Sequence, residues 1–306
     1  MFAEVAEQAA QATLRRSWEL GMRYYDTAPL YGHGVSERRL GEFLQQRPRD
    51  QFVVSTKVGR LLLPEPPADP KRYSIGSSPF QGAAPLYPTF DFTYDGAMRS
   101  VEESLRRLGL DRVDVLLIHD PDDFYEEALA GAYVAIDQLR REGVIGAIGV
   151  GMNQAEMLAR FARETDVDCF LVAGRYTLLD HAALGELLPL CVEKRIGVII
   201  GGVYNSGILT DPRPGSTFNY QPAEARWIER ARRLKQVCDR HGVPLMAAAI
   251  QFPAAHPAVA TILTGVRSAQ EIEENERMFR FPIPSALWQE LRAEGLLPES
   301  APIPNE

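Results

Sequence analysis

Short apolar runs alternate along the chain with longer stretches in which apolar residues recur every three or four positions. Runs of the first kind predict buried strands, and the longer periodic stretches predict amphipathic helices. We expect strands at 22–25, 51–56, 113–118, 144–150, 168–172, 197–200 and 259–263. We expect helices at 4–20, 35–46, 95–108, 124–142, 223–241, 245–255 and 268–278, and near 285–294. One further helix should begin at about 154, and another should follow the strand at 168–172 and end at about 194.

Apolar strands separated by helices are typical of βαβ units in a parallel sheet. No G-x-G-x-x-G motif follows a strand, which favours a closed barrel over an open doubly wound sheet. We therefore expect an α/β protein with a (β/α)8 TIM barrel in a single domain over residues 1–306. The chain opens on a helix, so we expect the barrel's first strand to be missing from this chain and the native start to lie upstream.

Residues 61–95 have no clear period, and they are rich in proline and aromatic residues. A connection this long is usually functional or disordered, and disordered tracts are poor in aromatic residues. We interpret it as an ordered lid over the ends of the strands, and a floppy insertion is the alternative. Its aromatic residues are Tyr73, Phe80, Tyr87, Phe90, Phe92 and Tyr94.

Composition excludes several classes of partner. The net charge of −8 argues against nucleic acid and anionic membranes as main partners. No apolar run is long enough to span a membrane, and no signal peptide is evident, so we expect a cytoplasmic protein. Cys169, Cys191 and Cys238 are far apart in sequence, so we expect no metal site. We expect a small-molecule substrate, and we expect the protein to be a monomer or a weak homodimer.

Four polar residues stand at or just beyond the ends of predicted strands. Asp26 follows MRYY, Tyr31 lies five residues later, Lys57 ends QFVVSTK and His119 ends VDVLLIH. The carboxyl ends of barrel strands converge on one face, where active sites are built. A lysine beside a tyrosine favours the phenolate, an aspartate keeps the lysine charged, and a histidine can hydrogen-bond a substrate oxygen. The set therefore predicts acid–base chemistry.

The segments 21-GMRYYDTAPLYGHGVSERRLGEFL-44, 52-FVVSTKVG-59 and 112-RVDVLLIHDPD-122 resemble the aldo-keto reductase family. The resemblance implies a (β/α)8 barrel that binds a nicotinamide nucleotide without a Rossmann domain. It also implies that Asp26, Tyr31, Lys57 and His119 form the catalytic set. Tyr31, His119 and Arg175 are the substrate contacts that we expect.

The same resemblance suggests where the cofactor binds. Asn153 matches a residue that holds the carboxamide, and Tyr204 matches one that stacks on the nicotinamide ring. Backbone N–H groups in 205–209 are expected to hold the phosphates. The positions equivalent to 2′-phosphate ligands are Gly265 and Glu271, which predicts NAD, with NADP possible through Arg267. The expected cofactor contacts are Asn153, Tyr204, Asn205, Ser206, Gly207, Leu209, Gly265, Arg267, Glu271, Glu274 and Asn275.

Within the family, 172-VAGRYTLLD-180 and 201-GGVYNSGIL-209 resemble a branch of sugar and pyridoxal dehydrogenases. We expect an NAD(P)-dependent oxidoreductase that oxidises an aldose at C1 to a lactone. The alternatives are a pyridoxal dehydrogenase and a general NADPH-dependent aldehyde or ketone reductase. A nucleotide-binding regulatory subunit without turnover is the non-enzyme alternative.

Overall fold

The structure is a computed structural model that describes residues 4–74 and 80–304. The chain divides into two compact units. The first comprises the chain up to Met152 with Val167–Cys169 and Val266–Ile272. The second comprises Asn153–Asp166, Phe170–Gly265 and the chain from Glu273 onward.

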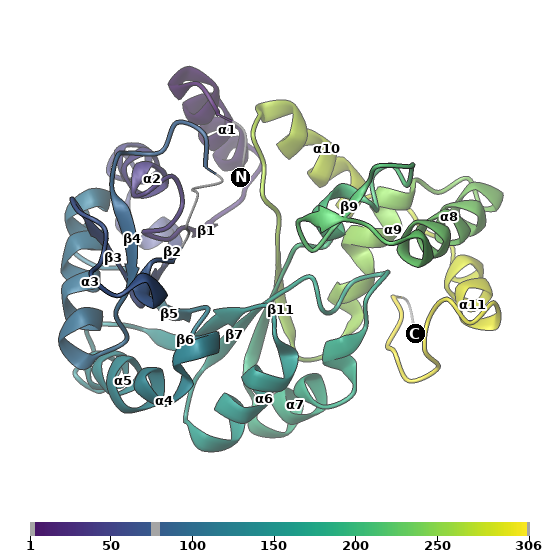
Figure 1. The fold of residues 1–306 in the computed structure, drawn as a ribbon. Helices are drawn as coiled ribbons and strands as arrows, with labels where there is room; N and C mark the ends of the chain where they lie inside the picture. The colour runs from purple at the N-terminus through teal and green to yellow at the C-terminus, as the bar shows by residue number, and fades with distance from the viewer. Residues whose placement is uncertain (1–3, 75–79, 305–306) are drawn as a thin grey trace. The chain divides into compact units, whose positions relative to one another are not determined.

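The first unit contains four parallel strands that run in the order β1–β2–β5–β6. Their bounds are Tyr24–Asp26, Val53–Val58, Val115–His119 and Ala147–Met152. Helices α2, α3 and α5 lie along the outer side of these strands (Figure 1). The helices of this unit are α1 (Glu7–Glu19), α2 (Val35–Leu44), α3 (Tyr94–Leu108), α4 (Tyr125–Glu127) and α5 (Tyr133–Arg141). A five-residue π-helical segment, Ala128–Ala132, joins α4 to α5.

Glycine permits the close approach of α2 to the end of α3. A Cβ atom on Gly41 would lie 2.0 Å from the carbonyl oxygen of Leu108. Gln45, at the end of α2, also donates through Nε2 to that oxygen at 2.9 Å. The helix that follows β1 is thereby fixed against the helix that precedes β5.

The second unit repeats the alternation of strands and helices. Strands β8 (Gly197–Gly201) and β11 (Val259–Leu263) pair in parallel, and all of β7 (Cys169–Ala173) except its first residue belongs to this unit. The helices are α6 (Ala155–Glu164), α7 (Leu187–Lys194), α8 (Ala225–Arg240), α9 (Leu245–Gln251), α10 (Ala269–Phe279) and α11 (Ser285–Ala293); the boundary between the units falls within α10. An antiparallel hairpin of two short strands, β9 (Thr217–Phe218) and β10 (Gln221–Pro222), precedes α8.

The seven strands that alternate with helices are those expected from the sequence, but two segments differ. The segment 61–95 is not irregular throughout: β3 (Arg60–Leu63) pairs antiparallel with β4 (Tyr87–Phe90). Pro88 lies inside β4 and hides its strand pattern, since proline is tolerated mainly in edge strands. Residues 75–79 of the expected lid lie outside the described residues. The helix expected to end near 194 is confined to α7, because turns and a 3-10 segment occupy much of 174–186.

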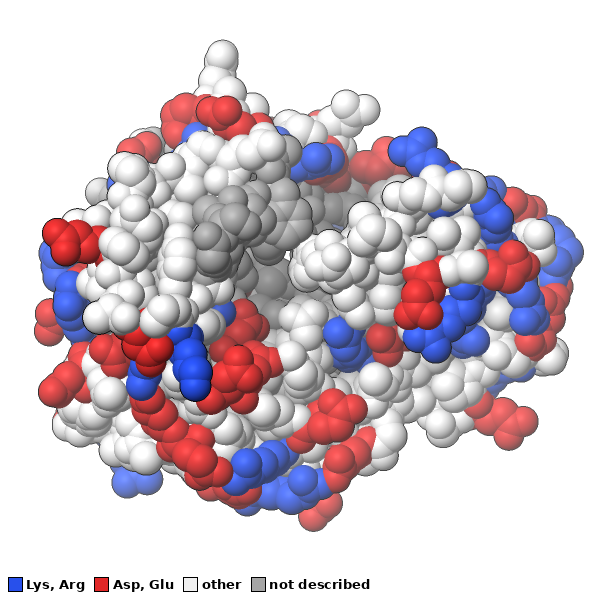
Figure 2. Space-filling model, in the orientation of Figure 1, with Lys and Arg blue, Asp and Glu red and all other residues white. Residues whose placement is uncertain are grey.

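The surface carries interspersed acidic and basic side chains on the face drawn in Figure 2. The three cysteines are buried and free. Over residues 4–74 and 80–304, no three His, Cys, Asp or Glu side chains are grouped so that they could hold a metal ion. No helix in that same part of the chain has the length and apolar character needed to cross a bilayer.

Candidate active site

Four predicted residues come together in the first unit. Asp26 is the last residue of β1, Lys57 is the fifth residue of β2, and His119 is the last residue of β5. The parallel register pairs Lys57 with Leu117, two residues before His119. Tyr31 lies in the turn between β1 and α2, where its amide donates to the carbonyl of Ala28 at 3.1 Å.

Lys57 and Asp26 form a buried ion pair. Lys57 Nζ lies 2.6 Å from Asp26 Oδ2 and also donates to the carbonyl of Thr27 at 2.9 Å. Ser55 Oγ donates to the other carboxylate oxygen at 2.5 Å. The side chains of Lys57 and Asp26 are 1% and 4% exposed, so water cannot stabilise either charge and each is stabilised by its partner. Burial opposes the ammonium form, but Asp26 and Tyr31 outweigh it and raise the pKa of Lys57.

Tyr31 lies between Lys57 and His119. The ammonium of Lys57 is 4.7 Å from the centroid of the tyrosine ring, so its positive charge acts on the phenol at short range. The ring of His119 meets Tyr31 edge-on at a centroid distance of 5.7 Å. Burial raises the pKa of Tyr31 above its ordinary value, and Lys57 offsets this only in part. Lys57 thus favours the phenolate, as a neighbouring cation should, but burial keeps the pKa of Tyr31 above its ordinary value.

His119 is buried and uncharged. Burial lowers its pKa well below the ordinary value, and the positive charges of Arg60 and Lys57 lower it further. Its Nδ1 is buried without a hydrogen-bond partner in the described part of the chain. Its Nε2 lies 3.4 Å from Asp120 Oδ2. A neutral imidazole beside a phenol can donate a hydrogen bond to a substrate oxygen while the phenol exchanges a proton with it.

The predicted cofactor contacts of the second unit are held by local hydrogen bonds. Asn153 Nδ2 donates to the carbonyl of Ala173 at 3.2 Å. Asn205 is buried: it accepts from Thr177 Oγ1 at 2.6 Å and donates to the carbonyl of Gly174 at 3.1 Å. The side chain of Asn205 therefore fixes the turn that carries it.

The turn 204–209 satisfies most of its own amides. The N–H groups of Asn205, Gly207, Ile208 and Leu209 donate to carbonyls at 202, 204 or 205, within 3.4 Å. Asn205 and Ser206 have positive φ values of 44° and 59°. Ser206 Oγ accepts from the amide of Tyr220 at 3.0 Å. A phosphate held by these amides would have to replace bonds that they already make.

The residues expected near the adenosine half form pairs of their own. In the first unit, Arg267 contacts Glu271 at 2.9 Å through its guanidinium and at 2.7 Å through its backbone N–H. In the second unit, Asn275 is buried and accepts from Tyr204 Oη at 2.8 Å. Glu274 is paired with Arg277 at 2.6 Å. A Cβ atom on Gly265 would meet no atom within 4 Å, so this position is open.

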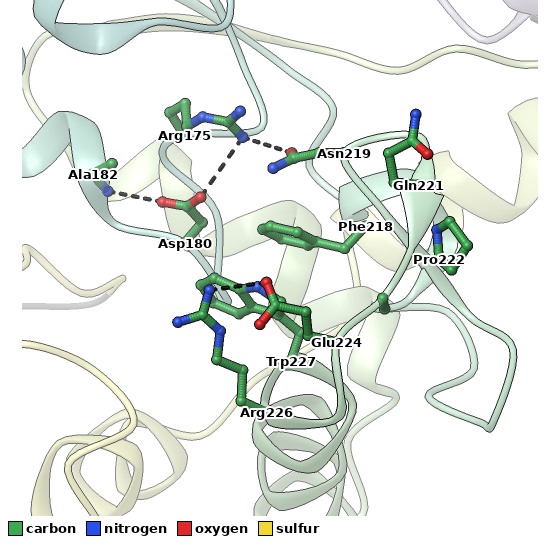
Figure 3. Close-up of a pocket in the computed structure, with 11 residues that line it drawn as sticks. Arg175, Asp180, Ala182, Phe218, Asn219, Gln221, Pro222, Glu224, Arg226 and Trp227 are labelled. Atoms are coloured by element: carbon green, nitrogen blue, oxygen red, sulfur yellow. Dashed lines mark hydrogen bonds and ion pairs between the residues drawn. The ribbon is translucent and has the colours of Figure 1, made fainter.

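Arg175, the remaining predicted substrate contact, lines a surface cavity of about 370 Å³ within the second unit (Figure 3). Its Nη1 donates to Asn219 Oδ1 at 2.6 Å and lies 3.7 Å from Asp180 Oδ2. Phe218 and Trp227 also line this cavity, and their rings stack with a centroid distance of 4.4 Å. Tyr31 and His119 belong to the first unit and Arg175 to the second.

Two residues of the first unit that the sequence did not indicate also contact the cluster. Arg60 is three residues beyond Lys57, and its Nη1 donates to the carbonyl of His119 at 2.8 Å. Asp120 accepts from Arg60 Nη2 at 3.1 Å and has a positive φ of 45°. The one signal in the sequence was the position of Asp120 directly after the strand-end His119.

Comparison with known proteins gives a consistent result. The sequence profile described as "Aldo/keto reductase family" matches residues 2–294. The chain is 42% identical to D-threo-aldose 1-dehydrogenase from a Pseudomonas species and 41% identical to pyridoxal 4-dehydrogenase from Microbacterium luteolum. Each alignment covers 97% of this chain and 91% of the relative. The holo form of an aldo-keto reductase from Bacillus halodurans matches with a TM-score of 0.74 at 23% identity, covering 99% of this chain and 91% of that one. This likeness confirms the predicted α/β barrel fold class.

Proposed function

The chain belongs to the aldo/keto reductase family and is an oxidoreductase, and we propose that it oxidises an aldose at C1 to a lactone with a nicotinamide nucleotide. The buried cluster of Asp26, Lys57, Tyr31 and His119 supports the chemistry. The 42% identity to D-threo-aldose 1-dehydrogenase over almost the whole chain supports the substrate class.

In the proposed reaction, Tyr31 is the general base. Its phenolate takes the proton from the anomeric hydroxyl, and the positive charge of Lys57 stabilises that phenolate. Uncharged His119 donates a hydrogen bond to the same substrate oxygen and fixes its position. The hydrogen on C1 leaves with its electron pair, the C1–O bond becomes a carbonyl, and the product is the lactone. The oxidised nicotinamide ring supplies the hydride acceptor when it is bound.

Several residues fit a nucleotide of this kind. The amide of Asn153 uses its Nδ2 on Ala173, which leaves Oδ1 as an acceptor for the carboxamide. The ring of Tyr204 is fixed through its hydroxyl by Asn275, as a stacking surface requires. Glu271 holds Arg267 in an ion pair, and its carboxylate would repel a 2′-phosphate. We therefore propose NAD as the preferred cofactor.

Oxidation of pyridoxal is the second candidate, since the identity to pyridoxal 4-dehydrogenase is 41% over the same share of the chain. Both substrates need a proton acceptor beside the carbon that loses hydride. Phe80 is a candidate for the wall that meets either ring, because its centroid lies 6.4 Å from that of Tyr31.

The test is a panel of initial rates of NADH formation with purified protein. L-fucose, L-galactose and D-arabinose are the first sugars, and pyridoxal is measured beside them. The proposal predicts a higher kcat/KM for at least one sugar than for pyridoxal, with a lactone as product. Turnover of pyridoxal alone would assign the second candidate. NADPH-driven reduction of simple aldehydes, without oxidation of any member of the panel, would overturn both.

A further inference from the structure

Arg60 is a buried cation in contact with a predicted catalytic residue. It begins β3, and its side chain is 5% exposed. Each of the three guanidinium nitrogens donates a hydrogen bond. Nε donates to Ser74 Oγ at 2.6 Å, Nη1 to the carbonyl of His119 at 2.8 Å, and Nη2 to Asp120 Oδ2 at 3.1 Å. Its outer face lies 4.6 Å from the centroid of the Phe90 ring. Burial of a guanidinium carries a large desolvation cost, and hydrogen bonds and ion pairs of this kind offset that cost.

The peptide that Arg60 binds is unusual. Asp120 follows directly on β5 and has a positive φ of 45°, a backbone conformation that is strained for a residue other than glycine. Its amide donates to the carbonyl of Gly151 at 3.0 Å. Arg60 binds both sides of the same residue junction, the carbonyl of His119 and the carboxylate of Asp120. These two contacts fix the backbone that carries the imidazole of His119.

The carboxylate of Asp120 lies close to both the guanidinium of Arg60 and the imidazole of His119. It is 3.1 Å from the guanidinium of Arg60 and 3.4 Å from Nε2 of His119. A carboxylate this close to an imidazole favours the imidazolium, and a neighbouring guanidinium offsets that effect. Burial and the charges of Arg60 and Lys57 hold the pKa of His119 low.

The other ionisable groups near this junction are Tyr31, Lys57 and Asp122. Lys57 acts in the same direction as Arg60, because it is a second cation that lowers the pKa of His119. Tyr31 is protonated at neutral pH, since its pKa is raised by burial. The pKa of Asp122 is raised by burial and then by Asp120, and Arg60 opposes this rise.

We propose that Arg60 is a positioning residue for the oxidation: it fixes the His119–Asp120 junction and cancels the charge of Asp120, so that His119 remains an uncharged hydrogen-bond donor. This inference rests on the proposed role of His119 in substrate oxidation. It adds a second cation, from β3, to the one that β2 supplies through Lys57. Both lower the pKa of His119, but they make different contacts: Lys57 pairs with Asp26 beside Tyr31, and Arg60 binds the carbonyl of His119 and the carboxylate of Asp120.

The direct test is NMR titration of His119 in protein labelled at the histidine rings, with a His119→Asn sample to assign its signal among the five histidines. In the parent protein, His119 should not titrate between about pH 5 and pH 8, the range in which an ordinary histidine changes charge. In Arg60→Met, loss of the guanidinium leaves Asp120 uncompensated, so the pKa of His119 should rise and its signal should shift with pH within that range. In Arg60→Met/Asp120→Asn, both charges are gone and His119 should again be silent.

Kinetics supply an independent readout. Below the pKa of Tyr31, log kcat/KM for oxidation should rise with pH with a slope of one, because one group must lose a proton. In Arg60→Met the slope should approach two below the raised pKa of His119, because His119 must then lose a proton as well. Arg72→Met is the matched control: Arg72 belongs to the same segment but pairs with Glu127 at 2.6 Å, so the variant should keep the parent slope and a silent His119.

Two further variants keep the test decisive. Arg60→Gln retains a donor for the carbonyl of His119 without the charge, and it should also make His119 titrate. Arg60→Lys keeps the charge without the fork of donors, so His119 should stay silent while kcat falls by about tenfold or more. The proposal is overturned if His119 stays silent in Arg60→Met and Arg60→Gln, if the double variant still titrates, or if Arg60→Lys retains the parent kcat. Since the titration needs no substrate, it stands even if no sugar is oxidised, an outcome that would count against the proposed function alone.

Discussion

Replacement of Lys57 by methionine should remove the charge that makes Tyr31 usable as a base. The ammonium of Lys57 is 4.7 Å from the tyrosine ring, and it is 2.6 Å from the carboxylate of Asp26. Methionine keeps most of the length of the side chain and none of its charge. The variant therefore leaves Tyr31 buried near the negative charges of Asp26 and Asp120, without the ammonium that offsets them.

The size of the effect follows from these distances. Loss of an opposite charge in contact with an ionisable group moves its pKa by about 1–3 units. The pKa of Tyr31 is already above its ordinary value, because burial outweighs Lys57. Oxidation requires the phenolate, whose fraction below its pKa falls tenfold for each unit by which the pKa rises. We expect kcat/KM for oxidation at neutral pH to fall by about 10- to 10³-fold.

The sign of the pH dependence gives the assay. In the parent protein, the oxidation rate should increase with pH through neutrality and level off only above the pKa of Tyr31. In Lys57→Met, the same rise should continue to a higher pH. Measurement of kcat/KM across the stable pH range checks the shift. Activity near that of the parent, with the rise ending at the same pH, would show that Lys57 does not control the pKa of Tyr31.

A control must separate this effect from loss of stability. Lys57→Met leaves the Asp26 carboxylate, 4% exposed, with Ser55 as its remaining donor, and unpaired buried charges cost about 3–5 kcal/mol. In Lys57→Met/Asp26→Asn, neither charge remains, so much of the stability in urea should return. The lost oxidation activity should not return with it.

Three other changes have defined outcomes. Tyr31→Phe should lower kcat by about 10²-fold or more with little change in the dissociation constant of the cofactor, because the hydroxyl is the proposed proton carrier; stopped-flow turnover and fluorescence titration measure the two, and near-full activity would remove Tyr31 from the mechanism. Glu271→Gln should free Arg267 and raise the ratio of kcat/KM for NADP over NAD by about tenfold, the effect expected for a charged pair near a phosphate; a parent protein that already prefers NADP would contradict the cofactor proposal. Gly41→Ala should destabilise the protein by about 1–3 kcal/mol in urea unfolding, because its methyl would lie 2.0 Å from the carbonyl oxygen of Leu108; a neutral change would show that α2 can move away from α3.

Much of the site could be predicted because strands and chemistry coincide in the sequence. VDVLLIH is a continuous apolar run that ends in one polar residue, and the structure makes it β5, ending at His119. The same logic placed Lys57 in β2 and Asp26 at the end of β1. Tyr31 was found through its spacing from Asp26, and the turn after β1 brings it to the ends of these strands.

The remaining features depend on contacts that no local pattern encodes. The pKa of Tyr31 is set by burial, which could not be read from a tyrosine in a loop. Arg60 looked like an ordinary basic residue after Gly59, and its role emerges only from its bond to a carbonyl 59 positions away. The β3–β4 hairpin was missed because its second strand is four residues long and contains Pro88.

Isotopic labelling of the sugar at C1 shows whether hydride leaves that carbon of an aldose. L-fucose deuterated at C1 would be incubated with the purified protein and NAD, and the reduced cofactor and the sugar product would be examined by mass spectrometry. Hydride transfer from C1 should give deuterium in the reduced nicotinamide and a lactone that has lost the label, with Tyr31→Phe forming little of either. A reduced cofactor without deuterium, or a product that keeps the label at C1, would contradict it.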